Sequence, residues 1–147
     1  MQLTKYTDYA LRTLIFVALQ KPAQRVTISN VSEHFDVPRN NLVKIVNHLG
    51  KLGYIETVRG KGGGIRLARP ATKINLREVI EATEETLIPI DCQKVNCRIR
   101  SACRLSGIMA EAQEAFMGVF GRYHISDLVD NPERLEQLLK WYPHAAS

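Results

Sequence analysis

A glycine-rich stretch between two short runs of strand-forming residues does most to limit the folds open to this chain. Residues 60–64 read Gly-Lys-Gly-Gly-Gly, and the runs flanking them span 55–59 and 65–69. Because glycine accepts positive φ angles and close approach of another backbone, the pattern predicts a β-hairpin with these glycines at its tip. A phosphate-cradling loop is excluded, since the stretch matches neither nucleotide-binding glycine motif and a strand follows it.

Three amphipathic segments precede this hairpin. Apolar residues recur at three- and four-residue steps over 2–20, 26–35 and about 39–51, which predicts three helices with one buried side each. Helix, turn, helix and two-stranded wing is the order of a winged helix-turn-helix domain. We expect this domain to occupy residues 1–70 and the protein to be mainly α-helical.

Cationic and amide side chains gather on the exposed side of the third predicted helix. Arginine and asparagine are the residue types that bond bidentately to guanine and adenine edges in a major groove. An ordinary solvated helix face is the alternative. The predicted wing carries Arg59 and Lys61, which suit contacts along phosphates or in a minor groove. The residues predicted to contact double-stranded DNA are Ser29, Arg39, Asn40, Lys44, Asn47, Arg59 and Lys61.

Charge and composition agree with a polyanionic partner. The formal net charge is +5 and the pI is about 9.3, and lysine and arginine far outnumber acidic residues in the segment 36–70. No apolar run is long enough for a transmembrane helix, so no membrane partner is expected. An enzyme is disfavoured because no Ser-His-Asp or paired-carboxylate pattern occurs and the four histidines are dispersed.

The rest of the chain predicts helices joined by a long loop. We expect Asn75 to cap a helix, with Glu78 at its third position, that fades near Glu85. Residues 104–121 have a wide apolar stripe and little charge, which predicts a long helix. That helix either completes the monomer core or pairs with a second copy. Pairing is favoured because the DNA-reading domain already has core helices of its own.

All three cysteines, Cys92, Cys97 and Cys103, lie within twelve residues. Their odd number and the lack of a secretory signal argue against disulfides and for a reducing, cytoplasmic location, where clustered cysteines more often bind metal. Basic residues among them favour the thiolate form that binds metal. Structural zinc and iron–sulfur clusters both need four ligands, so the spacing leaves the two open and demands a fourth ligand. Use of the cysteines as small packing residues is the alternative.

Four stretches together resemble the Rrf2 family of bacterial winged-helix regulators. They are residues 3–12 (LTKYTDYALR), 58–67 (VRGKGGGIRL), 74–81 (INLREVIE) and the three cysteines. The resemblance, closest to members that repress nitric oxide detoxification genes, implies a homodimer on a palindromic DNA operator. It also implies one iron–sulfur cluster per subunit, with [4Fe-4S] favoured over [2Fe-2S], and nitric oxide as the signal.

The family resemblance leaves two neighbouring functions as alternatives. One is a regulator of iron–sulfur cluster assembly or iron status, whose pattern has a histidine where this chain has Ser106. The other is an electron-transfer iron–sulfur protein, which the basic helix face and basic wing disfavour.

Asp8 is predicted to be the fourth ligand, in addition to the three cysteines. Asp8 lies off the apolar face of the first helix, inside a stretch that matches the family. An ion pair with Arg12 at i+4 is the structural alternative for this carboxylate. The other candidate ligands are Asp91, Ser106 and His124.

The domain organisation follows from these assignments. We expect residues 71–103 to form a connecting helix and the cluster loop, and residues 104–147 to hold the dimerisation helix and the C-terminal helices. The last helices are predicted to open at Ser126-Asp127 and at Asn131-Pro132, and to end near Trp141 and Pro143.

Overall fold

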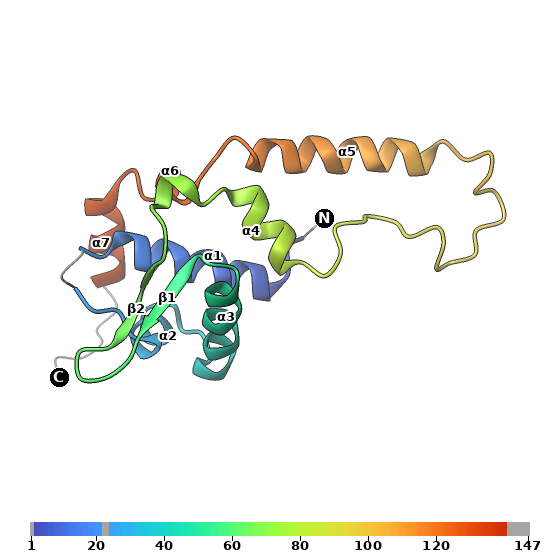
Figure 1. The fold of residues 1–147 in the computed structure, drawn as a ribbon. Helices are drawn as coiled ribbons and strands as arrows, with labels where there is room; N and C mark the ends of the chain where they lie inside the picture. Colours follow the sequence, from blue (N-terminus) through green and yellow to red (C-terminus); the bar gives the residue numbers. More distant parts are fainter. Residues whose placement is uncertain (1, 22–23, 141–147) are drawn as a thin grey trace.

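The computed structural model describes residues 2–21 and 24–140, and the side chains among them up to residue 139. It is mainly helical with one two-stranded antiparallel sheet, as predicted (Figure 1). The elements in chain order are α1 (Lys5–Leu19), α2 (Ile28–Phe35), α3 (Arg39–Lys51), β1 (Ile55–Val58), β2 (Gly64–Leu67), the 3-10 turn η1 (Ala71–Lys73), α4 (Leu76–Thr83), α5 (Leu105–Phe120), α6 (Ile125–Leu128) and α7 (Pro132–Lys140).

The first helix is shorter at both ends than the predicted 2–20. It begins at Lys5 because Thr4 has extended backbone angles and serves as the N-cap, its side chain accepting a hydrogen bond from the Thr7 amide. It ends at Leu19, followed by an extended C-cap at Gln20. α1 packs against α3, α4, α6 and β2, so it is the central helix of the body.

The helix-turn-helix is closed by local hydrogen bonding at each end of α2. Thr27 and Asn30 form a reciprocal capping box that starts α2. Asp36 ends it in the left-handed conformation, with φ of 51°. Pro38 then precedes α3, whose bounds agree with the predicted 39–51.

The wing has shorter strands than predicted. β1 pairs antiparallel with β2, with Ile55 opposite Leu67 and Val58 opposite Gly64. The second strand stops at Leu67 rather than residue 69. Arg69 turns back instead, stacking its guanidinium over the Tyr54 ring at 4.9 Å and donating a hydrogen bond to the Gly53 carbonyl.

A third segment, which the sequence did not predict, lies beside the wing. The Ile65 amide donates a 2.7 Å hydrogen bond to the Val26 carbonyl, forming an isolated antiparallel bridge. Gly64 permits this approach because a Cβ there would collide with the Val26 backbone. The connection between α1 and α2 is thereby joined to the hairpin.

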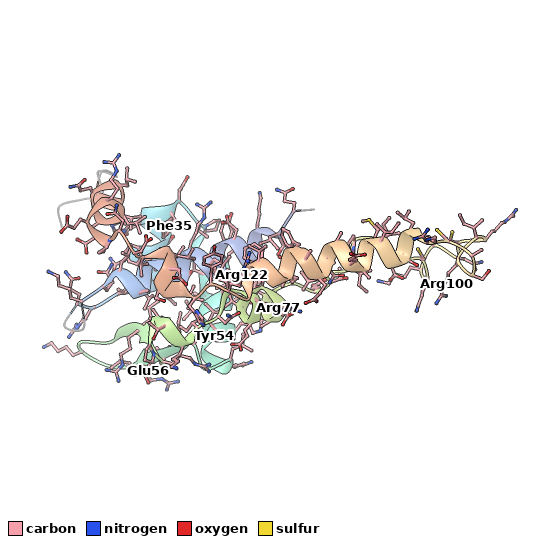
Figure 2. The ribbon with its side chains drawn as sticks, turned by 90° about the horizontal axis from the view of Figure 1, so that it is seen from above. Phe35, Tyr54, Glu56, Arg77, Arg100 and Arg122 are labelled. Carbon is pink, nitrogen blue, oxygen red and sulfur yellow. The ribbon has the colours of Figure 1, made fainter. Side chains whose placement is uncertain are left out.

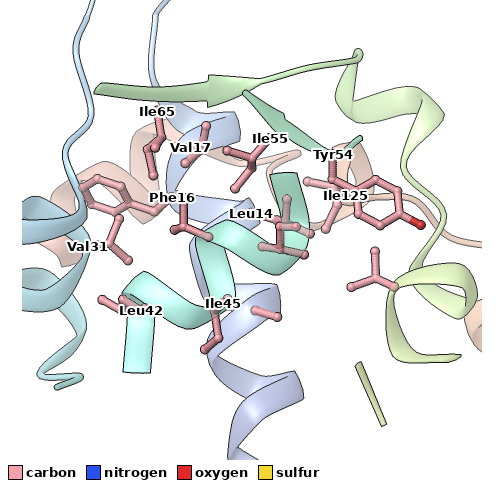
Figure 3. Close-up of a cluster of buried hydrophobic side chains, with 14 of the residues drawn as sticks. Leu14, Phe16, Val17, Val31, Leu42, Ile45, Tyr54, Ile55, Ile65 and Ile125 are labelled. Atoms are coloured by element: carbon pink, nitrogen blue, oxygen red, sulfur yellow. The ribbon is translucent and has the colours of Figure 1, made fainter. Parts of the chain in front are cut away.

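One hydrophobic core unites α1, α2, α3 and the sheet (Figure 3). Leu14, Ile45 and Ile55 are fully buried in it. Burying each such side chain contributes about 1.5–3 kcal/mol of transfer free energy. Ile125 of α6 is also fully buried there, so the chain returns to this core after α5.

The C-terminal helices differ slightly from prediction. Asn75 caps α4 as expected, accepting from the Arg77 amide. α6 begins at Ile125, one residue before the predicted Ser126, because His124 takes the N-cap position. α7 begins at Pro132 as expected. The predicted ends near Trp141 and Pro143 lie outside the described residues.

Between α4 and α5 the chain leaves the body. Residues 84–104 form an irregular loop at the far end of α5, with Arg100 near its tip (Figure 2). We call this segment the cysteine loop because it holds all three cysteines. α5 extends from the body to this loop like an arm (Figure 1).

Candidate functional site

The predicted DNA-reading strip is exposed along α3. Four of its side chains stand opposite the buried apolar side of the helix, and the Arg39 Nε donates a 3.4 Å hydrogen bond to the Ser29 hydroxyl of α2. This contact joins the starts of both helices of the helix-turn-helix into one polar surface. The exposed strip residues on α3 are Arg39, Asn40, Lys44 and Asn47.

The cations of the wing fall into two groups. Arg66 is paired with Glu56 across the strands, and Arg69 is occupied by Tyr54 and the end of α3. Arg59 and Lys61 at the tip are exposed, and neither has an ion-pair partner among the described residues. The two predicted tip residues are therefore the ones whose charge is available to a ligand.

A further cation at the wing was missed by sequence reasoning. Arg25 precedes the bridge residue Val26, and its guanidinium packs directly against Gly62 in the hairpin tip. Its sequence neighbourhood has no regular periodicity, and only the long-range bridge brings it to the wing. A basic residue one position before a β-branched residue was the sole sequence signal.

The cysteine loop is organised by short turns of its own. The Asp91 carboxylate accepts hydrogen bonds from the Gln93 and Lys94 amides, at 3.0 and 3.2 Å, which starts the turn after Cys92. Asn96 adopts φ of 47° immediately before Cys97. Asp91, one candidate for the fourth ligand, is therefore already bonded to the backbone of the loop.

The three cysteines are free thiols, each partly exposed. Among the described residues, no three Cys, His, Asp or Glu side chains converge as a metal-binding group. The donor set nevertheless fits iron–sulfur or zinc chemistry, because three thiols on one loop supply all but one of the ligands that either centre needs. The described residues of one subunit thus supply three thiols on one loop, but these thiols do not converge on one point. No fourth ligand lies with them among the described residues.

The remaining candidates for that ligand lie apart from the loop or on its edge. Asp8 accepts a 2.9 Å hydrogen bond from the Arg12 Nε, which is the ion pair given as its alternative. Ser106 is exposed in the first turn of α5. His124 caps α6 beyond the 16 residues of α5, so about 24 Å of helix separates it from the loop.

The chain matches the Rrf2 family, described as "Iron-dependent Transcriptional regulator", over residues 3–131. It belongs to the Rrf2 family. It is 41% identical over 143 residues to the HTH-type transcriptional regulator NsrR of Bacillus subtilis, covering 95% of this chain and 98% of that protein. It is 40% identical over 146 residues to the NsrR of Halalkalibacterium halodurans, covering 97% and 100%. This Rrf2 protein is thus a transcriptional regulator and not an enzyme.

Solved structures agree on the Rrf2 fold. CymR, the global cysteine regulator of B. subtilis, superposes with a TM-score of 0.70 at 17% identity, covering 88% of this chain and 97% of that one. The T. potens IscR superposes with a TM-score of 0.72, also at 17% identity, covering 92% and 91%. The winged-helix architecture is therefore confirmed.

In this Rrf2 chain, hydrogen bonds connect the start of α1 both to the cysteine loop and to α3, the recognition helix of the helix-turn-helix. The Thr4 amide and hydroxyl both donate to the Glu84 carboxylate, at 2.8 and 3.0 Å, so the start of α1 is held to the start of the loop. Two residues later, the Tyr6 hydroxyl bonds the His48 Nδ1 of α3 at 2.9 Å. Partial burial raises the pKa of the Tyr6 hydroxyl. α1 thus contacts both the loop and the recognition helix through polar groups.

The apolar stripe of α5 is largely exposed, and only its end beside the core, where Phe120 packs, is covered by the described chain. Leu105, Ile108 and Val119 are 48%, 54% and 44% exposed, and Met117 is the one buried residue of the helix. Exposed apolar side chains along one helix face mark an interaction surface. Among the described residues, no helix has the length and apolar run that a membrane crossing needs.

Proposed function

We propose that this protein is a homodimeric, DNA-binding repressor that holds an iron–sulfur cluster and releases DNA on exposure to nitric oxide. The observation that carries the proposal is the grouping of three free thiols on one loop between α4 and α5. That loop lies between an exposed apolar helix and a domain with a cationic reading face. The reducing cytoplasm is the compartment that suits such thiols.

The two subunits would pair along α5. Its exposed leucine, isoleucine and valine side chains would be buried against the same stripe of a second copy, with Ala112 and Ala115 permitting close approach. Crossing of the two arms would carry the cysteine loop of one subunit toward the first helix of its partner. In this arrangement Cys92, Cys97 and Cys103 of one subunit would hold the cluster together with Asp8 from the other.

The dimer would read a palindromic operator. Each α3 would lie in a major groove, and the half-sites would be about 34 Å apart, which is one helical turn of DNA. Arg39, Asn40 and Lys44, which are exposed on α3, would approach the bases. Arg59 and Lys61 would contact the backbone or the adjacent minor groove.

The switch would act through the restraint of the cysteine loop. When bound, the cluster supplies iron, a [4Fe-4S] form being favoured, that nitric oxide can attack. Cysteines bound to one centre would hold the start of α5, and hence the spacing of the two reading domains. Release of the thiols would let that spacing change. A hundredfold loss of DNA affinity needs about 2.7 kcal/mol, so a modest change in geometry suffices.

The test is a titration of anaerobically purified protein. Iron and sulfide are assayed first, with Mössbauer spectroscopy to establish the cluster type. Stepwise nitric oxide is then followed by mobility shift on a DNA duplex, beside cluster-free protein. Loss of DNA binding in step with the cluster supports the proposal. Equal binding by loaded, nitric oxide-treated and cluster-free protein would refute it.

A matched pair of variants isolates the thiols. Cys97→Ala is expected to give a folded dimer that lacks the cluster and does not repress. Ser101→Ala, an exposed position on the same loop, keeps all three thiols and is expected to behave like the parent. Cluster loss in both variants would assign the effect to the loop fold rather than to the cysteine.

A second candidate is a regulator of iron status or cluster assembly. The family description "Iron-dependent" favours it, whereas Ser106 in place of the histidine of that pattern disfavours it. The two functions separate experimentally. Iron chelation without nitric oxide should release DNA for an iron-status regulator, while a nitric oxide sensor keeps its tightly held cluster and its DNA.

A further inference from the structure

We infer that Arg25 binds a phosphate of duplex DNA beside the wing, as a third cation available for DNA there, with Arg59 and Lys61. The inference rests on the proposed DNA binding and adds a residue from outside the helix-turn-helix and hairpin. Arg25 is exposed in the connection between α1 and α2. Its guanidinium packs against Gly62, in the same tip that carries Lys61.

The backbone fixes Arg25 to the wing. The Ile65 amide bonds the Val26 carbonyl at 2.7 Å, and Gly64 lets the Val26 backbone approach closely. Gly62, with φ of 105°, has no side chain that would push the guanidinium away. Arg25 is therefore held one residue from a strand bridge, and it would approach DNA together with the hairpin.

The charge of Arg25 is available to a ligand. Among the described residues, no ion pair involves it, in contrast to Arg66, which is paired with Glu56. A carboxylate that could compete for it is on α7, where Glu136 lines the same cavity of about 290 Å³ as Arg25 and Lys21. The charged side chains among the described residues that line this cavity are Lys21, Arg25 and Glu136.

The chemistry of the Arg25 guanidinium favours a phosphate as its partner. A guanidinium presents parallel N–H donors that match two phosphate oxygens, and arginine is favoured wherever phosphate is recognised bidentately. Arg25 lies on the connection beside the hairpin rather than on α3, so it would bind the DNA backbone independently of base sequence. Removing one phosphate-binding cation reduces the slope of log affinity against log salt by about 0.9.

The experiment compares Arg25→Ala and Arg25→Lys with the parent. The probe is a fluorescein-labelled duplex that cluster-loaded parent protein has enriched from a randomised library. Affinity is measured by anisotropy across a salt titration. Arg25→Ala is expected to bind more weakly, with a slope smaller by about 0.9. Arg25→Lys keeps the charge and is expected to keep the slope.

The possible outcomes distinguish a failure of the Arg25 contact from a failure of DNA binding as a whole. If the parent enriches no duplex, DNA binding itself fails. If the parent binds but Arg25→Ala keeps the full slope, Arg25 has no phosphate partner and the inference is overturned. A thermal melt of both variants tests whether Arg25 only packs against Gly62. A lower melting temperature and weaker binding with an unchanged salt slope would assign Arg25 to packing, and this result would also overturn the inference.

Discussion

Arg77 on α4 donates two parallel hydrogen bonds to the Glu114 carboxylate on α5, at 2.7 and 3.0 Å. The same guanidinium donates to Glu81 one turn further along α4, at 2.7 Å. These bonds join the arm to the body along the part of α5 nearest the core. α5 is thus bonded to α4 at Glu114, between the core and the cysteine loop.

The attachment of α5 should depend on pH. Hydrogen bonding from Arg77 lowers the pKa of the Glu114 carboxyl and raises that of the Arg77 guanidinium. The contribution to stability is complete above the pKa of an unfolded glutamate, about 4.3, and disappears as pH falls through the lowered folded pKa. Glu114→Gln should lower the melting temperature slightly at pH 7, and its difference from the parent should shrink below about pH 4.3. A difference that is constant with pH would contradict this linkage.

The wing tip should supply a salt-dependent part of DNA affinity. Arg59→Ala is expected to weaken binding and to flatten the salt dependence, because the tip would then have one cation fewer to neutralise phosphates. The double variant Glu56→Ala with Arg66→Ala on the same hairpin is the matched control, since it removes an ion pair without changing the net charge. Anisotropy titrations over a range of salt concentrations give both slopes. Parent-like binding by Arg59→Ala throughout would exclude the tip from the interface.

Asp8 should behave as a cluster ligand rather than as the partner of Arg12 alone. Asp8→Ala is expected to fold, to change the absorption spectrum of the loaded protein and to speed loss of the cluster. Arg12→Ala breaks the same 2.9 Å ion pair but leaves the carboxylate in place, so its spectrum should match the parent. Indistinguishable spectra and lifetimes for the two variants would move the ligand elsewhere.

The α5 face should hold the dimer together. Ile108 is 54% exposed, and Ile108→Glu would place a carboxylate in the paired stripe, where burial of a charge is costly. We expect a monomer by size-exclusion chromatography with light scattering. Leu138 on α7 is 53% exposed, and Leu138→Glu should remain a dimer. A dimeric Ile108→Glu protein would show that the copies pair through another surface.

Local patterns explain which predictions were confirmed. The bounds of α3 and the Asn75 cap were predictable because helix periodicity and capping involve residues within four positions of one another. The grouping of the cysteines and the alternative pairing of Asp8 with Arg12 are local in the same sense. The start of α1 was placed three residues early because the capping role of Thr4 was not recognised.

Long-range contacts account for what the sequence did not reveal. Beyond the end of the second strand, the Arg69 side chain stacks on Tyr54, fifteen positions away by residue number. Arg25 reaches the wing only through the bridge between Val26 and Ile65. Neither contact leaves a periodic signal, because each joins single residues from segments that are distant in the chain.

The amino-acid sequence by itself determined the order of helix, helix, helix and hairpin, the cationic face of α3 and the concentration of thiols between Cys92 and Cys103. Apolar spacing and glycine placement dictate these features locally. Only the tertiary structure decided that Arg25 joins the wing, that Arg66 is neutralised and that α5 leaves its apolar stripe exposed. The physical reason is that exposure and charge pairing depend on which distant segments the shared core brings together.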